Sequence, residues 1–279
     1  MPILFMGSPE FALPSLQIFE TAFKENLHVI TQPDKAKGRK QILQPTPIKK
    51  YCLEKQIPCY CPTDKAALIE SVKRIQPCCI VVVAYGKLLP HEIIDTYLCL
   101  NVHPSLLPLY RGPSPLQAPL LNGDSHTGVS IIKLVEAMDA GPIAAQEKID
   151  IQPEDTAASL HDQLGKLGAQ LLLQCTQDYL KDANSLIFEN QDESKASLCP
   201  LIRTADAELL ATDSALQKWH KIRAYNPKPG AYIMQNNQRI KIFKASLEND
   251  QIIPLEIQVE GKQKMAYDEY LKGGQEIAL

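Results

Sequence analysis

The chain of 279 residues lacks several features that define large protein classes. Its longest purely apolar run, Cys78 to Tyr85, is far shorter than the roughly 20 residues that cross a bilayer. Its N-terminus has neither a basic region nor a long apolar stretch, so we expect no signal peptide. It carries no excess of positive charge, because 29 basic and 32 acidic residues give a net charge of −3. With 45% apolar and 22% charged residues, the composition is that of a folded globular protein.

Familiar catalytic and nucleotide-binding motifs are also missing. There is no G-x-G-x-x-G and no G-x-x-x-x-G-K-[ST], which disfavours dinucleotide and nucleoside-triphosphate sites of the usual kind. Neither H-E-x-x-H nor G-x-S-x-G occurs, so zinc proteolysis and hydrolase chemistry lack support.

The eight cysteines form no C-x-x-C pair, and the single residue between Cys59 and Cys61 does not fit a zinc site. Cys78 and Cys79 lie in an apolar run, where free cysteine acts as a small hydrophobic residue. We therefore expect reduced cysteines, no metal and a cytoplasmic location.

The first part of the chain alternates between apolar strand patterns and helical patterns. This alternation predicts an α/β fold with a mostly parallel, doubly wound sheet, which binds ligands at the carboxyl ends of its strands. The predicted strands are Ile3–Met6, Leu27–Thr31, Ile80–Ala84, Leu98–Val102 and Val129–Val135, and the predicted helices are Phe11–Lys24, Pro47–Lys55, Lys65–Ile75 and Thr156–Leu180.

The last part of the chain has a different pattern. The segment Asp182–Pro200 is polar and without a clear period, which is typical of a linker. A helix is predicted over Ala205–Tyr225. Three short strands follow at Ala231–Ile233, Arg239–Ala245 and Ile252–Val259, separated by turns at Asn236-Asn237 and Asn249-Asp250. These patterns predict a small β-rich second domain.

Two polar side chains stand at the end of the strand before Pro104. Asn101 and His103 are two residues apart, so in a strand both leave the same face. An amide and an imidazole together can stabilise a developing oxyanion, and the imidazole can also transfer a proton. The alternative is structural: Asn101 caps a turn and His103 is a half-buried histidine with satisfied hydrogen bonds.

An acidic residue follows another predicted strand. Asp139, in Ala137-Met138-Asp139-Ala140-Gly141, comes after the strand Val129–Val135 and is expected at the same edge of the sheet. Beside His103 it would orient the imidazole ring. The alternative is an ordinary turn aspartate before a glycine. Together, Asn101, His103 and Asp139 fit acyl-type transfer without a covalent intermediate.

The stretch from Asn101 to Pro108, followed by Tyr110-Arg111-Gly112, resembles the signature of the folate-dependent formyltransferases. The opening residues 5–12 resemble the first strand and turn of the branch of that family that acts on charged initiator tRNA. Residues 222–227 with 229–232 resemble the start of that branch's C-terminal domain. The resemblance therefore runs over nearly the whole chain.

This resemblance implies a Rossmann-like formyltransferase domain and a small OB-like C-terminal domain. The implied reaction moves a formyl group from 10-formyltetrahydrofolate to the α-amino group of methionine on charged initiator tRNA. Asn101, His103 and Asp139 would be catalytic, in a monomer without metal. The folate would be bound by Ser105, Leu106, Leu107, Pro108, Tyr85 and Gly86.

A basic tract runs from Lys35 to Lys55. It has seven basic residues against one acidic residue, a local net charge of +6. Clusters of this kind bind phosphate backbones, although most charge runs are simply solvated surface. Residues 32–34 with 38–40 resemble the family's tRNA-contacting loop, which implies tRNA contacts from Lys35, Lys37, Arg39 and Lys40.

The expected domains are a catalytic domain over 1–183, a linker over 184–203 and a reduced C-terminal domain over 204–279. The reduction is inferred because only 15 residues, 246–260, separate two segments that resemble parts of the family's barrel. Three alternatives stay open. They are an N-formyltransferase acting on an amino-sugar nucleotide, a glycinamide ribonucleotide formyltransferase, and a non-enzymatic RNA-binding protein that retains the folate-domain shell.

Overall fold

The computed structural model describes residues 1–38, 41–274 and 276–279. The chain divides into two compact units. Unit 1 comprises residues 1–111, 128–148 and 162–198, and unit 2 comprises residues 112–127, 149–161 and 199–279. Residues 184–198 of the expected linker thus belong to unit 1 and residues 199–203 to unit 2, while the domain bounds expected above stay a prediction.

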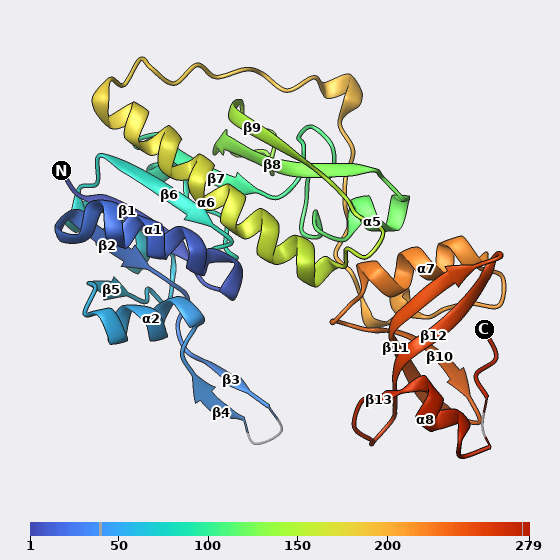
Figure 1. Ribbon diagram of the computed structural model, residues 1–279. Helices are drawn as coiled ribbons and strands as arrows, with labels where there is room; N and C mark the ends of the chain where they lie inside the picture. The colour runs from blue at the N-terminus through green and yellow to red at the C-terminus, as the bar shows by residue number, and fades with distance from the viewer. Residues whose placement is uncertain (39–40, 275) are drawn as a thin grey trace. The chain divides into compact units, whose positions relative to one another are not determined.

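A mixed, mostly parallel sheet is the centre of unit 1 (Figure 1). Within the described residues its strand order is β5-β2-β1-β6-β7-β8-β9. The first five of these strands pair in parallel, and β8 is antiparallel to β7. The strands are β1 (Ile3–Gly7), β2 (Leu27–Ile30), β5 (Cys59–Tyr60), β6 (Cys79–Val83), β7 (Cys99–His103), β8 (His126–Lys133) and β9 (Ile143–Asp150).

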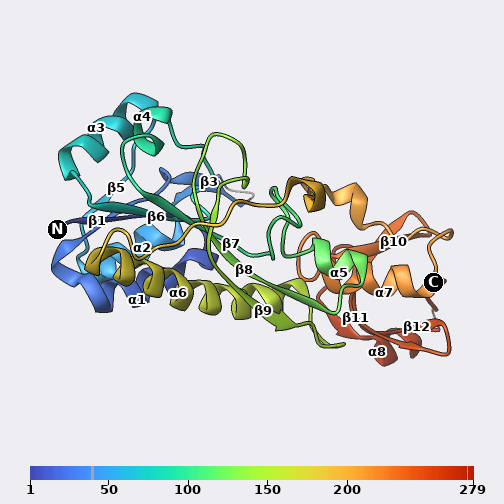
Figure 2. The same ribbon diagram turned by 90° about the horizontal axis from the view of Figure 1, so that it is seen from above.

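Helices cover both faces of this sheet. Helices α1 (Leu13–Phe23), α2 (Pro47–Lys55) and α6 (Ala157–Lys181) lie on one side, and α3 (Lys65–Ile75) and α4 (His91–Ile94) lie on the other (Figure 2). Because both faces are covered, β1 and β6 are apolar and buried along their whole length. Thr46 and Asp64 begin α2 and α3 by accepting hydrogen bonds from the N–H groups of Lys49 and Ala67.

Unit 2 contains an antiparallel sheet of β10 (Ala231–Gln235), β11 (Gln238–Glu248), β12 (Gln251–Val259) and β13 (Met265–Ala266). The helices α5 (Ala118–Asn122), α7 (Ala215–Ala224) and α8 (Tyr267–Leu271) belong to the same unit. Asn236-Asn237 and Asn249-Asp250 all adopt left-handed backbone conformations, as two-residue hairpin turns require. The two predicted turns are confirmed.

The predicted α/β fold with a β-rich second region is confirmed, but one local prediction is wrong and two features were not predicted. The helix expected over Ala205–Tyr225 begins only at Ala215, because Ser214 and Gln217 form a capping box there. Strand β9 was not predicted, since its outer half is polar and exposed. The basic tract contains a hairpin, β3 (Lys35–Lys37) with β4 (Ile42–Gln44), which the sequence did not predict. No helix of the described ranges is both long and apolar enough to span a membrane.

Candidate active site

Strand β7, which carries Asn101 and His103, ends at the edge of the sheet where its parallel neighbours also end. β1, β6 and β7 are parallel, so Gly7, Val83 and His103 lie at the same edge. Asn101 is the register partner of Val82, one residue before the end of β6. The chain order reverses between β1 and β6, which is the position where open α/β sheets bind ligands.

Asn101 and His103 face the side of the sheet away from α6. A Cβ added at Gly168 of α6 would lie 2.6 Å from Val102 Cγ1, so Val102 points toward that helix. Side chains alternate along a strand, and the residues on either side of Val102 therefore point the other way. Asn101 is half-buried and His103 is 4% exposed.

Each ring nitrogen of His103 has an oxygen neighbour. Nε2 lies 2.9 Å from the backbone carbonyl oxygen of Tyr110, and Nδ1 lies 3.6 Å from Oδ2 of Asp139. A carbonyl oxygen can only accept, so Nε2 carries the hydrogen in this contact. The structure thus brings His103 and Asp139 together, as the sequence predicted.

The two neighbours of His103 both have unusual backbone conformations. Tyr110 has φ 62° and Asp139 has φ 53°, in the left-handed region that residues other than glycine rarely adopt. Such conformations persist only where surrounding contacts hold them, and they are concentrated at functional sites.

The loop after His103 is held by buried hydrogen bonds. The Ser130 hydroxyl donates to the carbonyl oxygen of Ser105 (2.6 Å) and accepts from the N–H of Leu107 (3.0 Å). The Gln146 amide donates to the carbonyl oxygen of Leu107 (2.7 Å). Ser105 and Leu107 are buried, while Leu106 and Pro108 are half-buried. In this structure Ser105 and Leu107 support the loop, and the folate contacts predicted for all four residues stay predictions.

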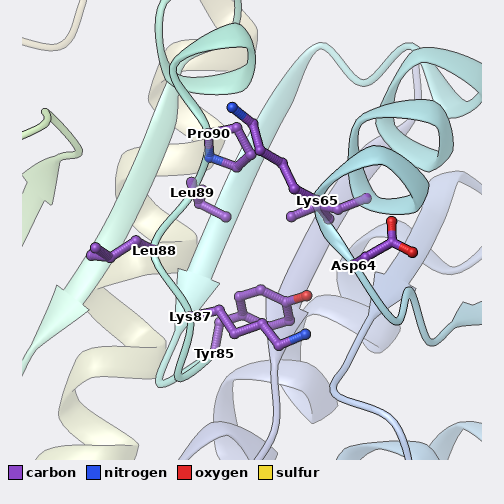
Figure 3. Close-up of a pocket in the computed structure, with 8 residues that line it drawn as sticks. Asp64, Lys65, Tyr85, Lys87, Leu88, Leu89 and Pro90 are labelled. Atoms are coloured by element: carbon purple, nitrogen blue, oxygen red, sulfur yellow. The ribbon is translucent and has the colours of Figure 1, made fainter.

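A pocket of about 290 Å³ lies beyond the end of β6 (Figure 3). Its lining includes Tyr85, Lys87 and, from the start of α3, Asp64 and Lys65. The hydroxyl of Tyr85 is buried and has no hydrogen-bond partner among the described residues. Burial raises the pKa of this hydroxyl to about 12, so it is a neutral donor at pH 7. A polar atom of this kind fits a ligand that accepts a hydrogen bond.

Gly86, which was predicted to bind the folate together with Tyr85, packs against Gln32. Gly86 has φ +78°, and a Cβ added to it would lie 2.6 Å from Nε2 of Gln32. The same Nε2 donates to the carbonyl oxygen of Tyr85 (2.7 Å), and Oε1 of Gln32 accepts from Lys35 (2.5 Å). Gln32 therefore joins the base of the basic tract to the turn at Tyr85.

The predicted tRNA contacts are described only in part. Lys35 lies at the start of β3 and is exposed, and Lys37 ends that strand. Arg39 and Lys40 lie outside the described residues. At the base of the tract, Lys49 forms an ion pair with Asp34 at 2.7 Å.

Sequence reasoning missed some residues that border the site. Lys65 and Asp64 carry only ordinary helix-start signals. Gln191 lies in a polar segment without a period, and its side chain donates to the carbonyl oxygens of Asp139 and Gly141 (2.8 and 2.7 Å). Of these bordering residues, only Arg111 could have been found from the sequence, because it belongs to the motif after Pro108. Arg111 is 7% exposed.

The fold agrees with the comparisons to known proteins. The family model described as formyl transferase matches residues 3–176, and the model of the formyl transferase C-terminal domain matches residues 201–254. These matches define the class of protein as a formyl transferase.

Curated relatives narrow this class. The methionyl-tRNA formyltransferase of Kosmotoga olearia is 40% identical over 88% of this chain and 80% of its own length. That of Caldicellulosiruptor saccharolyticus is 37% identical over 98% and 97%. The chain belongs to the methionyl-tRNA formyltransferase family.

Solved structures show the same fold. A methionyl-tRNA formyltransferase from Clostridium thermocellum superposes with a TM-score of 0.65 at 20% identity, over 93% of this chain and 98% of the other. An N-formyltransferase from Helicobacter canadensis, in complex with folinic acid and dTDP-3-aminofucose, gives 0.70 at 19% identity, over 89% and 88%. Since both superpose similarly, the fold alone does not separate a tRNA substrate from a sugar substrate.

Proposed function

We propose that this enzyme transfers a formyl group from 10-formyltetrahydrofolate to the α-amino group of methionine on charged initiator tRNA, in the cytoplasm and as a monomer. The observation that carries the proposal is the pairing of His103 with Asp139. His103 is the last residue of β7 and lies two residues after Asn101. The sequence relatives, 33–40% identical, support the tRNA substrate over an amino-sugar nucleotide.

The contact with Tyr110 gives the two nitrogens of His103 different roles. With Nε2–H donating to the carbonyl oxygen of Tyr110, a neutral imidazole has its lone pair on Nδ1. Nδ1 can therefore take the proton that the attacking amine loses. The carboxylate of Asp139, 3.6 Å away, stabilises the imidazolium that results. The imidazolium returns this proton to the nitrogen of tetrahydrofolate as the bond between that nitrogen and the formyl carbon breaks.

Asn101 supplies the neutral donor of the site. Its side-chain amide leaves the same face of the sheet as His103 and is only half-buried, so it can reach a bound substrate. We assign it to the oxygen of the formyl group, which becomes negative as the amine attacks. Donors of this kind typically contribute about 2.7–4 kcal/mol to lowering the barrier.

The pocket beyond β6 suits the formyl donor. Tyr85 offers a buried hydroxyl, and Lys65 and Lys87 offer positive charge for the carboxylates of a folate. We therefore assign Tyr85 to the donor pocket. In the loop after His103 we assign further donor contacts to Leu106 and Pro108, because both are only half-buried.

The basic tract is the proposed contact for tRNA. Lys35 and Lys37 lie in β3, Arg39 and Lys40 follow them in the sequence, and a cluster of positive charge binds phosphates. We propose that the reduced C-terminal domain adds to this interface.

One assay tests the function against its rivals. The purified protein is incubated with 10-formyltetrahydrofolate and either methionine-charged initiator tRNA or a dTDP-amino sugar, and N-formyl product is measured. Product on the tRNA alone supports the proposal. Product on the sugar alone favours the sugar N-formyltransferase. Binding of tRNA without product on either substrate favours the non-enzymatic RNA-binding protein.

A further inference from the structure

Part of the segment expected to be a linker is bound to the loops beside His103. Glu189 and Ile143 exchange two backbone hydrogen bonds of 2.8 and 2.9 Å. Further along, the hydroxyl of Ser197 accepts from the N–H of Tyr110 (2.9 Å), and its carbonyl oxygen accepts from the N–H of Arg111 (2.9 Å). Residues 189–197, which we call the strap, therefore contact both the loop of Asp139 and the loop of Tyr110.

The side chain of Gln191 lies at the centre of the strap. Its Nε2 donates to the carbonyl oxygens of Asp139 (2.8 Å) and Gly141 (2.7 Å). Its Oε1 accepts from Nε and a terminal nitrogen of Arg111 (2.9 and 2.8 Å). A side-chain amide has two donor hydrogens and two acceptor lone pairs, and here all four are used within the protein.

Arg111 is in turn fixed by a second partner. Two of its nitrogens donate to the two carboxylate oxygens of Glu193, at 2.9 and 2.7 Å. This bidentate geometry is the strongest form of the arginine–carboxylate pair. The pair lowers the pKa of Glu193 and raises that of Arg111. The strap thus supplies both the amide and the carboxylate that hold the guanidinium.

These contacts form a closed series that begins and ends at His103. Arg111 follows Tyr110, whose carbonyl oxygen accepts from Nε2 of His103, and Gln191 holds the backbone of Asp139, whose carboxylate faces Nδ1. Tyr110 and Asp139 both have left-handed conformations, which need outside contacts to persist. Gln191 is the residue that connects these two strained positions.

We infer that Gln191, through Arg111 and the backbone of Asp139, is a positioning residue that sets the orientation and tautomer of the His103 imidazole. It contacts neither ring nitrogen, so it acts only by holding the two groups that do. The inference rests on the proposed function, because it assigns the purpose of the held imidazole.

The test compares Gln191→Ala and Gln191→Glu with Asp192→Asn. Glutamate keeps an acceptor for Arg111 but loses both donors to the carbonyl oxygens and places a negative charge beside them. Asp192 is the adjacent residue. In the described part of the chain its side chain accepts hydrogen bonds from Ser194 and pairs with Lys195, while its charge acts on Glu193 without a hydrogen bond, and asparagine can keep the cap on Ser194. We expect kcat for formyl transfer to fall on the order of 10- to 100-fold in both Gln191 variants. The KM of each substrate should stay within about threefold, and Asp192→Asn should match the unaltered enzyme.

A second readout does not depend on turnover. The ¹⁵N–¹H spectrum of the His103 ring, assigned with His103→Ala, should show a bonded Nε2–H in the unaltered protein and in Asp192→Asn. It should lose that signal in Gln191→Ala, with circular dichroism unchanged. Unaltered spectra and kcat in the Gln191 variants overturn the inference, as does a fall in kcat matched by a loss of folded protein. If the unaltered enzyme forms no product, the proposed function fails, while the spectra still decide whether Gln191 positions the ring.

Discussion

Gln32 donates a 2.7 Å hydrogen bond to the backbone carbonyl oxygen of Tyr85, 53 positions further along the chain. It also accepts from Lys35 and fills the space beside Gly86. One buried amide therefore connects the base of the basic tract with the turn that borders the pocket.

Replacing Gln32 by alanine should loosen that turn. We expect a loss of about 1–3 kcal/mol in the free energy of unfolding, because a 7% exposed side chain loses two hydrogen bonds. The KM for the formyl donor should rise about fivefold if the turn borders its site. Urea denaturation and steady-state kinetics measure both, with exposed Gln41→Ala as the control. A loss of stability with an unchanged donor KM would separate Gln32 from the donor site.

Asp139→Asn is a clean test of the charge beside His103. Asparagine tolerates the left-handed conformation that Asp139 adopts, so the backbone at φ 53° can be kept while the carboxylate is lost. We expect kcat to fall on the order of 100-fold with the melting temperature nearly unchanged.

His103→Ala and Asn101→Ala should each lower kcat/KM by about 10²- to 10³-fold. Near-normal turnover in purified His103→Ala would contradict the proposed mechanism.

The hydroxyl of Tyr85 can be removed without removing its ring. Because no described residue accepts from it, Tyr85→Phe should leave stability nearly unchanged or slightly raised. If the donor accepts from this hydroxyl, the donor KM should rise by about two- to tenfold. Tyr97→Phe, beside the same core cluster, serves as the control. An unchanged KM would remove the hydroxyl from the list of donor contacts.

Arg39→Ala should affect tRNA alone. We expect a higher KM for charged tRNA, an unchanged KM for the formyl donor, and a slope of log KM against log salt that is smaller by about one. The comparison is with Lys73→Ala, an exposed lysine in the last turn of α3. Identical salt dependence in both variants would exclude Arg39 from the tRNA contacts.

Asp213 makes the stability of unit 2 depend on pH. Burial opposes its ionisation, but hydrogen bonds from Lys221 (2.6 Å) and from the N–H of Leu210 (2.9 Å) outweigh burial and lower its pKa. A lowered pKa in the folded state adds stability that is fully present above the unfolded value, about 3.9, and is lost as the pH falls through the folded value.

Asp213→Asn should therefore destabilise the protein by about 1–3 kcal/mol at pH 7. The difference from the unaltered protein should shrink as the pH falls below the unfolded value of about 3.9 and through the lowered pKa of the folded aspartate, because the aspartate then becomes protonated as well. Thermal unfolding across this pH range measures the effect, and Asp250→Asn, in an exposed turn, is the control. A difference that stays constant with pH would show that the charge of Asp213 does not contribute.

Much of the architecture could be predicted from local sequence. Strands such as β1 and β6 are short, continuous apolar runs, and the turn at Asn236-Asn237 uses residues that accept a left-handed conformation. The start of α7 after Ser214 was harder to predict, because the helical pattern of the sequence begins before the capping box that starts the helix. The hairpin of β3 and β4 was missed, since its strands are only three residues long and β4 is exposed.

The sequence by itself determined which residues we propose for the chemistry, because Asn101 and His103 are neighbours on one strand and their motif is local. Tertiary structure decided what surrounds them. Asp139 faces His103 from the loop between β8 and β9, on the far side of an antiparallel pairing. Gln191 contacts Arg111 across 80 positions and the carbonyl oxygen of Asp139 across 52. A polar segment without periodicity gives no local sign of such contacts, because they arise only when the path of the folded chain brings distant backbone and side chains together.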